Sequence, residues 1–66
     1  MEDIDRIKGY IEETLRDVDP EYRIHEWQLE KENGQPIFEI EVVNESGHDI
    51  DYKYNVESGE MLKKDS

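Results

Sequence analysis

Residues 27–42 read WQLEKENGQPIFEIEV, and this stretch decides the fold. Apolar and charged residues alternate on both sides of Asn33-Gly34, a pair that favours a two-residue hairpin turn because both residues tolerate positive φ. A turn of this kind places Leu29 opposite Phe38, so that the apolar side chains of both strands share one face. The segment therefore predicts a β-hairpin with one apolar face and one acidic face.

Two further turn signals follow, at residues 45–47 and 57–59, and each ends in glycine. Their regular spacing predicts an antiparallel meander of four strands near residues 24–32, 35–43, 48–56 and 60–64. Three-residue loops at both turns keep the apolar residues in phase, and they place Tyr54 opposite Leu62. The predicted inner face consists of Trp27, Leu29, Phe38, Ile40, Val42, Ile50, Tyr52, Tyr54 and Leu62. Ile24 is out of phase with Trp27, which predicts either a β-bulge there or a late start of the strand.

The segment before the strands has helical periodicity over residues 3–18. Its apolar stripe consists of Ile4, Ile7, Ile11, Leu15 and Val18. Asp3 is the predicted N-cap, and Pro20 ends the helix. This stripe is the only cover that the sequence offers for the inner face of the sheet. We therefore expect an α+β fold in a single domain over residues 1–66, with one N-terminal helix packed on a four-stranded antiparallel β-meander.

Composition limits the function classes. The chain has 66 residues with 19 acidic and 8 basic side chains, a net charge of −11, and no cysteine. Nucleic-acid binding needs a basic surface, so that class is excluded, and disulfide or thiolate chemistry is excluded too. No apolar run is long enough to span a membrane. The sequence also lacks the pattern of a signal peptide, so a cytoplasmic location stays open.

The two outer hairpins resemble those of PepSY domains. Residues 27–42 match an apolar-acidic strand, an Asn-Gly turn and an aromatic-Glu-aliphatic strand, and residues 55–62 match the closing hairpin of that family. Asn55 and Ser58 stand where the family usually has Asp and Thr. The resemblance implies a helix-on-four-strands architecture like that of β-lactamase inhibitors. It also implies a non-enzymatic module outside the cytoplasm that binds or inhibits a peptidase, or regulates a protein of the cell envelope.

The most specific site prediction follows from the register. It places Glu26, Glu41 and Asp51 side by side on the outer face of three adjacent strands, because the strand offsets that align the core also align these acids. The next row across the sheet consists of Gln28, Glu39 and Lys53. Three interpretations stay open: a docking site for Lys or Arg of a partner, a weak divalent-cation site, or a solvated face that keeps the sheet soluble.

No other constellation indicates chemistry. His25, predicted beside Val42, and His48 lack the spacing of metal ligands, and the serines lie in turns or at the terminus, so we expect no catalytic, metal or cofactor site. Trp27, Phe38, Tyr52 and Tyr54 are interpreted as core rather than as a ligand platform, while Ile37 and Val43 are predicted to point outward. The predicted function is binding of a protein partner by Glu26, Glu39, Glu41, Asp51 and Lys53. The alternative is a free-standing acidic mimic of nucleic acid that inhibits a basic protein.

Overall fold

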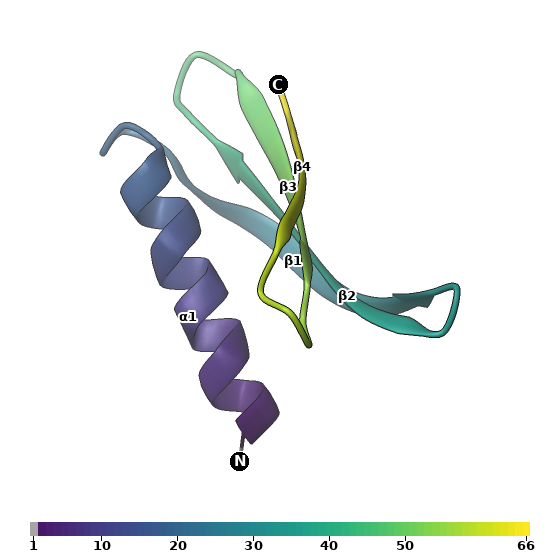
Figure 1. Cartoon of the computed structure of the whole chain (residues 1–66). Helices are drawn as coiled ribbons and strands as arrows, with labels where there is room; N and C mark the ends of the chain where they lie inside the picture. The colour runs from purple at the N-terminus through teal and green to yellow at the C-terminus, as the bar shows by residue number, and fades with distance from the viewer. Residues whose placement is uncertain (1) are drawn as a thin grey trace.

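The computed structural model describes residues 2–66, with side chains from residue 4 onward, and contains one helix and one sheet (Figure 1). The elements are α1 (Glu2–Asp17), β1 (Arg23–Glu32), β2 (Gln35–Val43), β3 (Asp49–Asn55) and β4 (Met61–Asp65). Every boundary lies within one residue of the prediction. Asp3, the predicted N-cap, lies inside the helix, and its side chain is outside the described part. The single described helix is too short and too polar to cross a membrane.

The sheet is an antiparallel meander in the order β1-β2-β3-β4, as predicted. Asn33 and Gly34 both have positive φ, 53° and 79°, and form the two-residue turn between β1 and β2. A three-residue loop joins β2 to β3, with Gly47 at a φ of 86°. Both turn types therefore match the prediction, and the register of the first three strands follows from them.

The predicted bulge lies in β1. Ile24 pairs with Val42 and Glu26 pairs with Glu41, so His25 has no partner on β2. The expectation that His25 lies beside Val42 is therefore wrong, because Ile24 takes this place and His25 is the extra residue of the bulge. Beyond the bulge the pairing of β1 is regular from Glu26 to the turn.

The last hairpin differs from the prediction by one residue. Asn55 pairs with Glu60, so the loop spans four residues, and Tyr54 pairs with Met61 instead of Leu62. A second bulge restores the predicted offset from Lys53 onward, but it leaves Leu62 exposed. The loop takes this form because Val56 is buried and its carbonyl oxygen accepts a hydrogen bond of 2.7 Å from the Tyr10 hydroxyl.

The core lies between α1 and the two central strands. It is built from Phe38, Ile40, Val42, Tyr52, Tyr54 and Val56. From the helix side, Ile7, Tyr10, Ile11 and Val18 pack against this cluster. Thr14 is fully buried between them, and its hydroxyl lies 2.9 Å from that of Tyr54. The aromatic residues of the two central strands are therefore core, as predicted.

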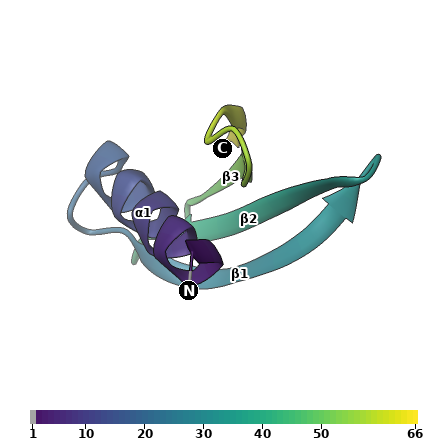
Figure 2. The same ribbon diagram turned by 60° about the horizontal axis from the view of Figure 1, so that its bottom comes forward.

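Five residues predicted in the core are exposed instead: Leu62, described above, and Ile4, Leu15, Trp27 and Leu29. Leu15 is exposed because Thr14 takes the buried position beside it, while Ile7, Ile11 and Val18 of the predicted stripe do pack on the core. Trp27 and Leu29 belong to β1, and Figure 2 shows the β1–β2 hairpin extending past the end of α1. A helix of 16 residues is about 24 Å long, whereas the molecule measures 36 Å along its longest axis. The helix is thus too short to cover the whole inner face.

Ile37 points outward as predicted, but its burial is unexpected. It lies on the outer face, but it is only 3% exposed, since it is on a central strand between Glu30 of β1 and Asn55 of β3. Val43, predicted to point outward as well, is half-buried at the end of β2.

Candidate binding surface

The outer face of the sheet, on the side opposite α1, carries a line of four carboxylates. Glu26 pairs with Glu41, Glu41 pairs with Asp51, and Asp51 pairs with Asp65. The first three were predicted from the sequence, and Asp65 extends the line to β4. We call these four residues the acidic row. Neighbouring strands lie about 4.8 Å apart, so the row places one carboxylate on each of four successive strands.

The next row across the sheet is largely neutralised within the molecule. Gln28 donates to Glu39 at 3.2 Å, and Lys53 forms ion pairs with Glu39 at 3.5 Å and with Glu32 at 2.9 Å. Lys63 extends this row on β4, where it pairs with Lys53 in the register. The amino group of Lys53 therefore already has two carboxylate partners on its own face.

The basic side chains that pair with the acidic row lie at its two ends. Among the described residues, neither Glu41 nor Asp51 has Lys or Arg within ion-pair distance. Glu26 lies 3.8 Å from the imidazole of His25, the residue at the bulge, and Asp65 lies 3.7 Å from Lys63 of its own strand. The two central carboxylates of the row thus face one another without Lys or Arg beside them, although His25 lies close to Glu41.

The pKa values follow this difference between the rows. A hydrogen bond with Asp49 raises the pKa of Glu41, and partial desolvation and the charge of Asp51 raise it further. A hydrogen bond with Glu30 lowers the pKa of Glu39, with additional lowering from Gln28 and Lys53. Lone carboxylates among like charges bind protons more readily because their charged form is disfavoured. Glu41 therefore favours a proton or another positive charge, whereas Glu39 is stabilised as an anion, chiefly by Glu30, whose own pKa is raised in turn.

The twist of the sheet gives this surface a shallow hollow. An open groove of about 200 Å³ runs over the outer face. Its polar lining consists of Glu26, Gln28, Glu39, Glu41, Asp51, Lys53 and Lys63. All five predicted site residues are in this lining, so the structure brings them together. An open groove of this kind suits the side chains of a partner better than it encloses a small molecule.

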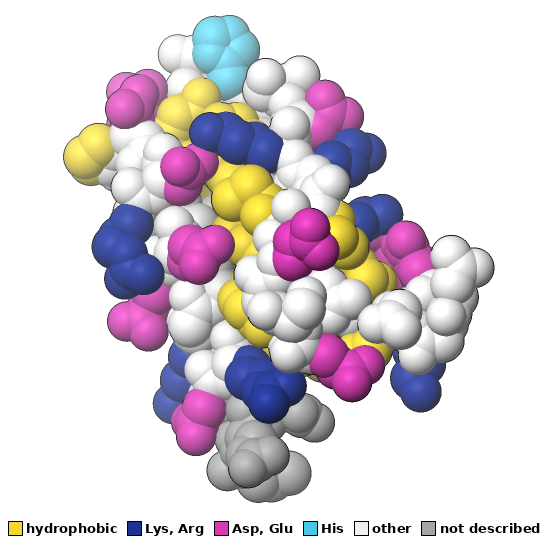
Figure 3. All heavy atoms as spheres, viewed as in Figure 1, with side chains coloured by type: hydrophobic (Ala, Val, Ile, Leu, Met, Phe, Trp, Pro, Cys, Tyr) yellow, Lys and Arg dark blue, Asp and Glu magenta, His cyan; other side chains and the backbone are white. Residues whose placement is uncertain are grey.

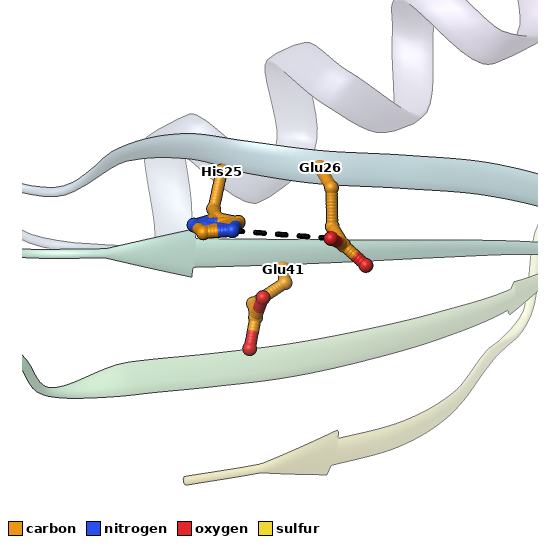
Figure 4. Close-up of side chains that lie close together, drawn as sticks. All are labelled: His25, Glu26 and Glu41. Carbon is orange, nitrogen blue, oxygen red and sulfur yellow. Dashed lines mark ion pairs between the residues drawn. The ribbon is translucent and has the colours of Figure 1, made fainter.

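Two groups of three side chains on this face have ligand atoms within 4.8 Å of one another: His25, Glu26 and Glu41 (Figure 4), and Glu30, Glu32 and Glu39. In Figure 4, the three labelled side chains of the first group project from adjacent strands on the same side of the sheet. Calcium needs six to eight oxygen ligands, and each group offers three ligand atoms. Lys53 also occupies two carboxylates of the second group. Neither group makes a cation site on these side chains.

Sequence reasoning missed Asp65, Lys63 and the place of His25. Asp65 and Lys63 belong to the last strand, whose outward side chains follow from the same offset once the strand is extended to its end. His25 could not be placed because the sequence shows that a bulge is needed without showing which residue is left unpaired.

Comparison of the chain with protein-family models, with curated proteins and with solved structures found no match. The resemblance to PepSY domains therefore rests on the two hairpins described above, and it stays a prediction.

Proposed function

We propose that this chain is a non-enzymatic protein-binding module that receives Lys or Arg side chains of a protein partner on the outer face of its sheet. The observation that carries the proposal is the acidic row, in which four carboxylates cross four strands. Among the described residues, its two central members, Glu41 and Asp51, have no Lys or Arg within ion-pair distance. Like charges directly opposite one another destabilise a sheet. A cationic partner would remove this repulsion and gain charge-assisted hydrogen bonds.

The resemblance to PepSY domains supports a peptidase as the partner. A module that covers a basic patch beside a peptidase cleft would restrict access of substrate without any chemistry of its own. The net charge of −11 on a chain of 66 residues would also speed the encounter with such a patch, because complementary fields steer association.

The test compares two double variants that each lose two negative charges, at different places on the molecule. Glu41→Gln with Asp51→Asn removes the negative charge from the centre of the acidic row, whereas Glu12→Gln with Glu13→Gln removes it from two exposed positions of α1. Both are measured for binding to, and inhibition of, purified peptidases with basic surface patches. We expect the first variant to lose binding by about tenfold or more, corresponding to about 1.4 kcal/mol, and the second to bind like the wild type. Equal losses in both variants would show that only total charge matters and would contradict the proposal.

One observation also favours the alternative of a nucleic-acid mimic, namely that the four carboxylates form a regular line across the sheet. Competition separates the two functions. A short DNA duplex would displace the chain from a protein whose groove normally holds nucleic acid, and it would leave a peptidase complex intact.

A further inference from the structure

We propose that the open edge of β1 accepts an extended segment of the partner as a fifth strand, and that this segment alternates Lys or Arg with apolar residues. The inference names the chemistry of the partner for the surface described above and so rests on the proposed function. It arises from a different observation, the exposed apolar side chains on β1.

The edge of β1 is open. β1 is the first strand of the sheet, so alternate residues direct N–H and C=O groups away from β2 and toward solvent. Every residue from His25 to Leu29 is exposed. The pairing of β1 with β2 is regular from Glu26 to Glu32, which gives an incoming strand a continuous template beyond the bulge.

The two faces of this template differ in chemistry. On the inner face, Trp27 is 48% exposed and Leu29 is 50% exposed, although both were expected in the core. The Trp27 ring is held against Phe38 with ring centroids 5.5 Å apart, so one side of the indole is packed and the other faces solvent. On the outer face the same strand carries Glu26 and Glu30. Figure 3 shows hydrophobic side chains, in yellow, at the surface of the molecule among charged ones.

A fifth strand would continue both patterns. Residues directly opposite one another on neighbouring strands share a face, so apolar side chains of the segment would cover Trp27 and Leu29. The intervening side chains would lie beside Glu26 and Glu30 on the outer face, where Lys or Arg would be favoured. Strand addition of this kind takes affinity from main-chain hydrogen bonds and specificity from alternate side chains.

A second copy of the chain fits this edge poorly. Antiparallel pairing of two β1 strands centred on Gln28 would place Trp27 against Leu29, but it would also place Glu26 against Glu30 twice. Each copy carries a net charge of −11, which adds repulsion. The other edge is a weaker template because β4 has only 5 residues and carries Lys63 and Lys64, and short, lysine-bearing strands resist edge pairing.

The probe for the experiment is a short peptide that alternates Lys with Val and has Lys at both ends. Trp27 is the only tryptophan, so its fluorescence reports coverage of the inner face directly. We expect a blue shift of its emission on binding, together with slower hydrogen exchange of alternate β1 amides. Sedimentation of the unliganded chain as a dimer through this edge would overturn the choice of occupant.

Backbone-modified peptides separate strand addition from simple charge attraction. One peptide has the backbone amide nitrogen of every Lys methylated, and the other has that of every Val methylated. Each therefore lacks main-chain N–H donors along one edge, and both keep the same charge. We expect one of them to bind like the parent and the other about tenfold or more weakly, because only one edge of an added strand faces β1. Equal affinity of all three peptides would overturn the inference while leaving the acidic face as the binding surface.

A matched pair of protein variants tests the inner face. Leu29→Ser and Leu62→Ser remove the same side chain from positions that are 50% and 45% exposed, on β1 and β4 respectively. We expect only Leu29→Ser to weaken binding of the parent peptide, and equal effects would contradict the assignment to β1. Loss of peptide binding in Leu29→Ser without any loss in Glu41→Gln with Asp51→Asn would support strand addition and show that the centre of the acidic row takes no part in binding this peptide.

Discussion

The hydroxyl oxygens of Thr14 and Tyr54 lie 2.9 Å apart between α1 and β3, and neither side chain is exposed to solvent. The Thr14 hydroxyl donates to the carbonyl oxygen of Tyr10 at 2.8 Å, so the Tyr54 hydroxyl is the donor between the two side chains. This pair joins the helix to the centre of the sheet and satisfies both buried hydroxyl groups.

Replacing Thr14 by Val should destabilise the fold through this pair. Val preserves the shape of Thr but leaves the Tyr54 hydroxyl without an acceptor, which costs about 1–3 kcal/mol. The double variant Thr14→Val with Tyr54→Phe should lose less free energy of unfolding than the two single variants lose together, because it buries no unpaired hydroxyl. Urea unfolding of the wild type, the two single variants and the double variant measures the coupling energy between the hydroxyls. Strictly additive losses of stability would show that the hydroxyls do not interact.

Replacing Glu41 by Gln should stabilise the isolated chain at low salt. The pKa of Glu41 is raised by Asp49, by desolvation and by Asp51, so its ionised form destabilises the folded state. The repulsion appears as the pH rises through this raised pKa and disappears in acid, where Glu41 is protonated. We expect Glu41→Gln to raise the urea midpoint at neutral pH, and salt or acid should reduce the gain. Glu12→Gln is the control, and an equal gain in that variant would contradict a local origin.

Asp17 links the end of α1 to the two last strands. Its carboxylate accepts hydrogen bonds of 2.7 Å from the Tyr52 hydroxyl and from Lys64. The bond from Lys64, and then that from Tyr52, lowers the pKa of Asp17 below 3.8. A lowered pKa contributes stability that is present at neutral pH and is lost as the pH falls below about 4.

Asp17→Asn should therefore reduce stability at neutral pH by less than about 1 kcal/mol, because Lys64 is partly exposed and solvent screens the pair. The Asn oxygen still accepts from Tyr52, so the variant tests the charge alone. Unfolding measured at neutral pH and again in acid should show a difference that shrinks as the pH falls. A difference that does not change with pH would mean that the carboxylate charge has no part in it.

The outer face could be predicted because turn chemistry fixes strand offsets. Asn33-Gly34 allows one tight turn and Gly47 allows a short loop, and these two choices alone align Glu26, Glu41 and Asp51. An error of one residue at either turn would have moved each acid to the wrong face.

The inner face was harder to predict because it depends on where the helix lies. Thr14 is polar, so periodicity alone favoured Leu15 for the stripe, yet Thr14 is buried because Tyr54 offers it a hydrogen bond. The last loop likewise depends on the bond from Tyr10 to the Val56 carbonyl, a contact between residues far apart in sequence. Such tertiary contacts override local turn preference and leave no signal in the strands themselves.

The most direct test of the acidic row as a binding surface is a titration of the isotopically labelled chain with an unstructured lysine peptide, followed by backbone NMR shifts. We predict that the largest shifts occur at Glu26, Glu41 and Asp51 and fade as salt is added, while the exposed acids of α1 shift little. Shifts of equal size at Glu12 and at Glu41 would contradict the proposal, because they would show that lysine is attracted to the acidic chain as a whole.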